Sequence, residues 1–67
     1  MIVVANYLRR LRRERRMSLS KVAASIGKDR STVWRYENNK INIPCSELLK
    51  LAELYGVSLE QLMTEPK

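Results

Sequence analysis

The sequence contains no histidine and no phenylalanine, and it has only one cysteine, Cys45. A single cysteine cannot form an internal disulfide, so the fold does not depend on an oxidising compartment. Without histidine, and with its acidic residues scattered, the chain lacks the ligands of a zinc site and the usual general base of an enzyme. We therefore expect no metal, no cofactor and no catalytic residue, and we predict that Cys45 is a small core residue.

Glycine, proline and long apolar segments are also scarce. Glycine occurs only at positions 27 and 56 and proline only at 44 and 66, so no flexible linker divides the 67 residues. No stretch approaches the roughly 18 apolar residues of a membrane span, and the apolar start is too short for a secretory signal. These absences predict one domain over residues 1–67, in a cytoplasmic protein.

Positive charge is abundant and unevenly distributed. The 13 basic and 7 acidic side chains give a net charge of +6. Residues 1–40 carry eleven of the basic and three of the acidic side chains, whereas residues 41–67 carry two and four. Such a one-sided field suits a polyanion that lies along one face of the protein. A well-solvated surface explains the charge equally well, so the decision depends on other features.

The spacing of apolar residues predicts helices throughout the chain, and the alternation typical of strands is absent. Val4, Tyr7, Leu8 and Leu11 fall on one face of a first helix over about residues 4–16. The other faces of this helix are almost entirely arginine. Some of these arginines are expected to touch or attract phosphates, and most to contribute only to the field.

Capping residues delimit a second and a third helix. Ser18 is suited to cap the start of the second helix, and Gly27 to end it, because glycine adopts a positive φ without strain. Asp29 then caps a third helix over about residues 30–38. The turn between them is so short that the two helices must cross at a steep angle, as in a helix-turn-helix.

Two more helices are predicted in the second half of the chain. Pro44 marks the start of the fourth, because proline is tolerated in the first turn of a helix, and Gly56 marks its end. Its apolar stripe is expected to comprise Cys45, Leu48, Leu49, Ala52 and Tyr55. Ser58 and Gln61 fit a capping box at the start of the fifth helix, and residues 64–67 are expected to fray. The predicted fold is therefore all-α, a compact five-helix bundle.

The third helix has two dissimilar faces at 100° per residue. Val33 and Tyr36 lie on one face, with Thr32 at its edge. The other face carries Arg30, Ser31, Trp34 and Arg35. Arginine can donate two hydrogen bonds to a guanine edge in the major groove of DNA, serine can donate or accept, and tryptophan offers apolar surface to a thymine methyl group or a sugar. This face predicts base contacts, with partial packing or a protein contact as alternatives for Trp34.

Residues 19–38 resemble the helix-turn-helix unit of the phage-repressor and Cro-like family, also called the XRE family. Within this unit the family pattern is matched by Ala23, Gly27, Val33, Tyr36 and Glu37. The resemblance extends over about residues 7–63 through Leu8, Leu11 and Arg12, the segment 48–52 and the segment 56–59. Each match is weak by itself, but together they keep register without a gap.

Because one recognition helix reads only a few base pairs, useful specificity predicts a homodimer on a two-fold-symmetric DNA site. The resemblance implies a lambda-repressor-like fold and a transcriptional regulator, a repressor, that binds double-stranded DNA. It implies an ion pair between Arg12 and Glu37, and base contacts from Arg30, Ser31, Thr32 and Arg35. Phosphate contacts are expected from Ser18, Lys21, Lys28, Asn38, Asn39 and Lys40.

Five positions depart from the family pattern. Leu19 replaces a glutamine that contacts phosphate in many members, so that support is expected to be missing. Arg16 and Asn39 each replace a glycine, and asparagine tolerates the left-handed backbone required there. Ile43 and Pro44 replace a typical proline and serine, which shifts the expected start of the fourth helix by a residue or two.

Two questions stay open at this point. The dimer surface is expected either on the fifth helix, at Leu59, Leu62 and Met63, or at the N-terminal Ile2 and Val3. The family also includes partner-binding modules such as antitoxins, whose other surface covers a toxin. A role in protein binding alone predicts an apolar or acidic third-helix face, which differs from the observed sequence, whereas a dual role remains compatible with it.

Overall fold

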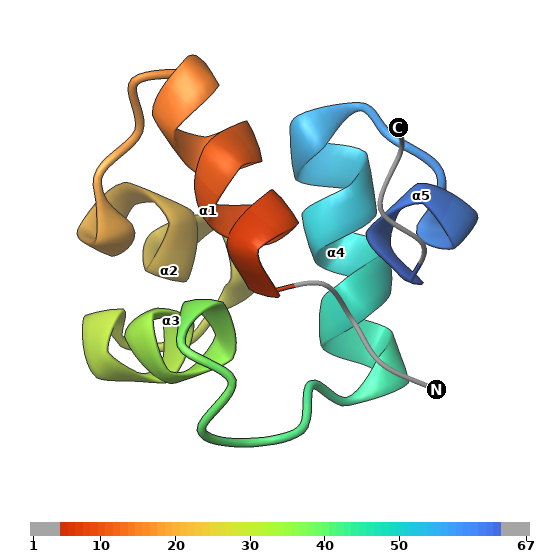
Figure 1. The fold of residues 1–67 in the computed structure, drawn as a ribbon. Coiled ribbons are helices and arrows are strands. Elements are labelled where there is room, and N and C mark those ends of the chain that lie inside the picture. The colour runs from red at the N-terminus through yellow and green to blue at the C-terminus, as the bar shows by residue number, and fades with distance from the viewer. Residues whose placement is uncertain (1–4, 64–67) are drawn as a thin grey trace.

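The computed structural model describes residues 5–63, which form five helices and no strand (Figure 1). The helices are α1 (Ala5–Glu14), α2 (Leu19–Ile26), α3 (Arg30–Glu37), α4 (Cys45–Tyr55) and α5 (Leu59–Met63). The predicted all-α five-helix fold is confirmed. The expectations for Ile2, Val3, Val4 and residues 64–67 lie outside the described residues. Within the described part, no helix is long and apolar enough to cross a membrane.

The predicted capping residues begin and end the helices as expected. The Ser18 hydroxyl accepts a hydrogen bond from the Lys21 amide, and Gly27 follows α2 with a φ of 71°. At α5 the capping box is complete. The Ser58 amide donates to Gln61 Oε1 at 2.8 Å, and the Gln61 amide donates to Ser58 Oγ at 3.1 Å. These local bonds satisfy amides that have no partner within the helix.

The first helix ends two residues earlier than predicted. Arg16 adopts a left-handed conformation, with a φ of 53°, and the Met17 amide donates to the Arg12 carbonyl at 3.1 Å. This is the closing bond of a Schellman motif, which normally has glycine at its left-handed position. A left-handed backbone costs a residue with a Cβ atom about 1–2 kcal/mol. The glycine expected from the family pattern is therefore replaced by a residue that adopts the same backbone with strain.

A single apolar core receives side chains from all five helices. Its buried residues are Tyr7, Leu8, Leu11, Val22, Ala23, Ile26, Val33, Tyr36, Leu48, Leu51, Ala52, Tyr55 and Leu62. Each fully buried leucine, isoleucine or valine contributes about 1.5–3 kcal/mol relative to an exposed one. Figure 1 shows α1 crossing the middle of the molecule, with α2 and α3 on one side and α4 and α5 on the other.

The apolar stripe of α4 differs from the prediction. Cys45 is exposed and the Leu49 side chain is 48% exposed, whereas Leu51 is buried. Leucines at 48, 49 and 51 allow two stripes at helical spacing that share Leu48, Ala52 and Tyr55, and packing selects the one that contains Leu51. The predictions of a core role for Cys45 and Leu49 were therefore wrong.

The expected dimer surface on α5 also needs a correction. Leu62 has no exposed surface, because it completes the core beneath α4. Leu59 and Met63 are partly exposed, and Leu59 packs against the core with the rest of its side chain. In this conformation Leu62 holds the monomer together and is unavailable to a second copy.

Candidate functional site

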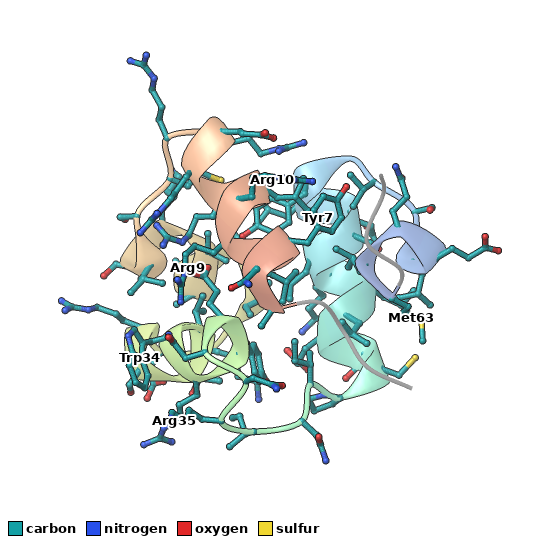
Figure 2. All side chains as sticks on the ribbon, viewed as in Figure 1. Tyr7, Arg9, Arg10, Trp34, Arg35 and Met63 are labelled. Carbon is teal, nitrogen blue, oxygen red and sulfur yellow. The ribbon has the colours of Figure 1, made fainter. Side chains whose placement is uncertain are left out.

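The helix-turn-helix segment places one face of α3 in the core and the other at the surface. Val33 and Tyr36 are 2% and 4% exposed, as predicted. On the opposite face Arg30, Ser31, Trp34 and Arg35 are all exposed. The Trp34 side chain is 47% exposed. Figure 2 shows Trp34 and Arg35 at the outer edge of α3, on the far side of the molecule from Met63.

At its N-terminal end, α3 is held by local bonds from one carboxylate. Asp29 Oδ1 accepts from the Thr32 amide at 2.9 Å, from the Thr32 hydroxyl at 2.6 Å and from the Ser31 hydroxyl at 3.3 Å. The bonds from Thr32 lower the pKa of Asp29, so this exposed carboxyl stays ionised. The Thr32 hydroxyl uses its only proton in this contact, which leaves it able only to accept from a base.

At its C-terminal end, α3 is held by a buried ion pair with α1. Arg12 Nε lies 2.8 Å from Glu37 Oε2, and Arg12 Nη2 donates to Glu37 Oε1 at 3.0 Å. Arg12 Nη1 also donates to the Met17 carbonyl at 3.0 Å. Glu37 is 3% exposed, and its hydrogen bond raises the pKa of Arg12. The structure thus contains the ion pair that the family resemblance implied.

A second arginine of α1 binds the same end of α3. Arg9 Nη2 donates to Asn38 Oδ1 at 2.8 Å and to the Glu37 carbonyl at 3.3 Å. Asn38 Nδ2 in turn donates to the Trp34 carbonyl at 2.8 Å. These bonds give Asn38 a structural role, and its phosphate contact stays a prediction. Sequence reasoning missed the role of Arg9, because it depends on how α1 crosses α3.

The other expected phosphate contacts flank α3 in the chain. Ser18 and Lys21 lie at the start of α2, and Lys28 lies in the turn before α3. Asn39 and Lys40 follow α3, and all five residues are exposed. Asn39 has a φ of 58°, the left-handed backbone predicted for this position. The structure therefore leaves these polar groups accessible before and after α3 in the chain.

The other arginines of α1 and of the turn after it have two different roles. Arg10 stacks on Tyr7 with 5.0 Å between the guanidinium carbon and the ring centroid, and Arg15 stacks on Tyr55 at 5.4 Å. Arg15 also donates to the carbonyls of Leu11 and Tyr55. Arg10 and Arg15 thus stabilise the fold, as Arg9 and Arg12 do. The exposed guanidinium of Arg13 adds to the positive field.

A buried carboxylate on α4 was also missed. Glu47 is 6% exposed, and its Oε2 accepts from the Ser46 hydroxyl at 2.9 Å. Its Oε1 has no hydrogen-bond partner and lies 3.8 Å from Lys50 Nζ. Within residues 5–63, no group of three or more histidine, cysteine, aspartate or glutamate side chains is placed to hold a metal ion. Glu47 is therefore a buried charge without a ligand set around it.

The tight Gly27 turn, the capped α3 and its exposed basic face define a helix-turn-helix unit. The chain belongs to the helix-turn-helix domain family, whose model matches residues 4–64. No curated protein sequence matches the chain. The fold prediction of a lambda-repressor-like domain is confirmed by similar solved structures, which we describe next.

Three solved structures illustrate this similarity. The P22 c2 repressor, solved with a synthetic operator, superposes with a TM-score of 0.85 at 14% identity, covering 92% of this chain and 94% of that one. The N-terminal DNA-binding domain of SinR from Bacillus subtilis has a TM-score of 0.84 at 27% identity, with 92% and 91% covered. SinR in complex with SinI gives the same score and identity, and this chain covers 61% of that SinR chain. The chain thus shares its fold with the P22 c2 repressor and with the DNA-binding domain of SinR.

Proposed function

We propose that this protein binds double-stranded DNA in a sequence-dependent manner, inserts α3 into the major groove and regulates transcription as a repressor. The observation that carries the proposal is the exposed face of α3, where Trp34 lies beside Arg30 and Arg35 and opposite the buried Tyr36. The major groove admits one α-helix, and arginine is its commonest reader of guanine. The half-exposed Trp34, between arginines, offers apolar contact to a thymine methyl group or a sugar in the same groove.

Sequence would be read by Arg30, Ser31, Trp34 and Arg35, which share the exposed face. Thr32 contributes less, because Asp29 already binds its hydroxyl proton. Phosphates would be held by Ser18, Lys21, Lys28, Asn39 and Lys40, which are exposed beside this face. Phosphate contacts set the register of the helix on the duplex, and base contacts set the choice of sequence.

We further propose that the protein acts as a homodimer. One recognition helix reads only a few base pairs, and a two-fold site with half-sites one helical turn apart doubles the information. Leu59 and Met63 on α5 are partly exposed, and Leu49 on α4 is also exposed. Met63 lies on the opposite side of the molecule from Trp34, so contact there leaves α3 free (Figure 2).

A protein-binding role is the alternative to DNA binding. SinR, 27% identical to this chain, has been solved together with SinI, which shows that a related protein assembles with a protein partner. A surface for protein binding alone is expected to be apolar or acidic. The exposed α3 face of this chain is neither. We therefore assign α3 to DNA and keep a protein partner as an outcome of the test.

Trp34 is the only tryptophan, and it supplies the signal for that test. The protein is titrated with mixed-sequence duplex DNA, and with the matching single strand as control, while Trp34 fluorescence and the anisotropy of labelled DNA are followed. We expect binding to duplex DNA to change the emission of Trp34. The logarithm of the binding constant should fall linearly with the logarithm of the salt concentration, with a slope of about 0.9 per phosphate contact. Binding with unchanged emission would move Trp34 off the contact face. Absence of binding at low salt would reject the DNA function in favour of a protein partner.

A further inference from the structure

We propose that Arg9 is a positioning residue that sets the orientation of the reading face of α3 through Asn38. This inference rests on the proposed DNA-binding function and deepens it. It assigns Arg9 no contact with DNA. The proposal is based on a continuous set of hydrogen bonds that begins on α1 and ends at the carbonyl of Trp34.

The first bond in this set joins two helices that are distant in sequence. Arg9 Nη2 reaches across 29 positions to Asn38 Oδ1 at 2.8 Å, and it also donates to the Glu37 carbonyl at 3.3 Å. The last carbonyls of an α-helix have no partner within the helix. Arg9 therefore satisfies a carbonyl at the end of α3 and fixes the side chain that follows it.

The second bond returns to the reading face. Asn38 Nδ2 donates to the Trp34 carbonyl at 2.8 Å, one turn back along α3. The backbone amide of Asn38 donates to the same carbonyl at 3.0 Å. The position of the Asn38 side chain is thus coupled to the turn that carries Trp34 and Arg35. A shift of Arg9 would be transmitted to these side chains through Asn38.

The arrangement of α1 shows that this contact is part of a fork. Arg9 and Arg12 are three residues apart, which places them on the same side of the helix. Among the described residues, every side-chain hydrogen bond between α1 and the Glu37–Asn38 end of α3 comes from these two arginines. Arg12 binds the buried Glu37 carboxylate, and Arg9 binds the Glu37 carbonyl and the Asn38 amide beyond it. Arg9 Nε also lies 4.0 Å from Glu37 Oε1. Two separated points of attachment restrict rotation of α3 more than one point does.

The guanidinium group suits this role better than an ammonium group. It is planar and presents several donors in a fixed geometry, whereas lysine carries a compact charge on a flexible stem. The Arg9 side chain is 33% exposed, so most of it is enclosed between the helices. Replacement by lysine keeps the charge of Arg9 but removes the geometry, and this separates positioning from electrostatic attraction.

The experiment therefore compares Arg9→Lys with Arg13→Lys, the same change at an exposed arginine of α1. A duplex sequence is first selected from a random library with the wild-type protein. Affinities for that sequence and for random duplex are then measured over a range of salt concentrations. We expect Arg9→Lys to lose about tenfold on the selected duplex, as when one base contact is lost, with little change on random duplex or in the salt slope. Arg13→Lys should stay within about twofold, the scatter expected of an ordinary surface substitution.

Three results would decide the question. Equal discrimination by Arg9→Lys and the wild type would overturn the positioning role. Loss of affinity on both duplexes in Arg9→Gln, with the salt slope reduced by about 0.9, would make Arg9 a phosphate contact instead. Failure of the wild type to select any sequence would reject the proposed function itself. That outcome is distinct from the two results that concern Arg9 alone. A shift of the Trp34 indole resonance in free Arg9→Lys, absent in Arg13→Lys, would support the coupling without DNA.

Discussion

The two ends of α3 are held in different ways. At the N-terminal end, the exposed Asp29 carboxylate binds groups from the next three residues only, so every contact is local. At the C-terminal end, Arg9 and Arg12 reach in from α1, and Glu37 is 3% exposed. Side-chain hydrogen bonds thus attach α3 to α1 at its C-terminal end, while those at its N-terminal end stay within residues 29–32. The buried Val33 packs the part of the helix between them against the core.

This difference matches what a groove-reading helix requires. The N-terminal residues of a recognition helix approach the bases most closely, and an exposed end leaves space for the duplex. The attached end gives the helix a defined direction relative to the core. The comparison predicts that substitutions at the buried end affect folding, that those on the exposed face affect binding, and that those at the local cap have small effects.

The largest effect is expected at the buried end. Glu37→Ala leaves Arg12 without its partner in a site that is largely closed to water. Breaking a buried ion pair by removing one partner costs about 3–5 kcal/mol. Urea unfolding followed by circular dichroism measures this loss, with the exposed Glu53→Ala on α4 as the matched control, expected within about 0.5 kcal/mol of wild type. Equal effects of the two substitutions would remove the distinction between the ends of α3.

A smaller effect, on binding, is expected in the middle of the exposed face. Arg35→Ala should leave stability nearly unchanged and cost about 1–3 kcal/mol on a selected duplex, because a bidentate base contact is lost. Lys40→Ala is the matched control, since loss of a phosphate contact should weaken all sequences alike and reduce the salt slope. Calorimetric or anisotropy titrations distinguish them. If Arg35→Ala weakened every duplex equally, Arg35 would be a phosphate contact.

The smallest effect is expected at the local cap, and it depends on pH. The bonds from Thr32 lower the pKa of Asp29 in the folded state below its unfolded value. The cap therefore stabilises the fold above the unfolded pKa, and this stabilisation is lost as pH falls through the folded pKa. Asp29→Asn retains an acceptor but cannot titrate, so it should flatten the acid limb of stability against pH. Carboxyl carbon shifts of Asp29 in an NMR titration check the direction, and a value at or above that of an unfolded peptide would contradict it.

Local signals in the sequence were sufficient for the starts of α2, α3 and α5 and for the division of α3 into two faces. Ser18, Asp29 and Ser58 bind amides within three residues, so their roles follow from nearest-neighbour chemistry. The exposure of Trp34 followed from helical geometry and the position of Val33 in the core. The base and phosphate contacts proposed for these elements remain predictions.

Long-range features were harder to predict. Leu49 and Leu51 both fit a helical stripe on α4, and only packing against the other helices places Leu51 inside. Leu62 appeared available for a dimer because periodicity cannot tell a monomer core from a contact between copies. The role of Arg9 depends on the crossing of α1 and α3, which residue spacing within α1 does not specify.

The arginines of α1 have a consequence for engineering. A protein of net charge +6 is an obvious candidate for charge reduction when non-specific adhesion to nucleic acid or surfaces is unwanted. In α1 and the turn after it, however, Arg9, Arg12 and Arg15 each donate to groups elsewhere in the fold. Neutralising them would therefore reduce adhesion but destabilise the protein. Arg16, at its left-handed position, offers the opposite exchange: glycine there would remove one positive charge and relieve backbone strain in a single substitution.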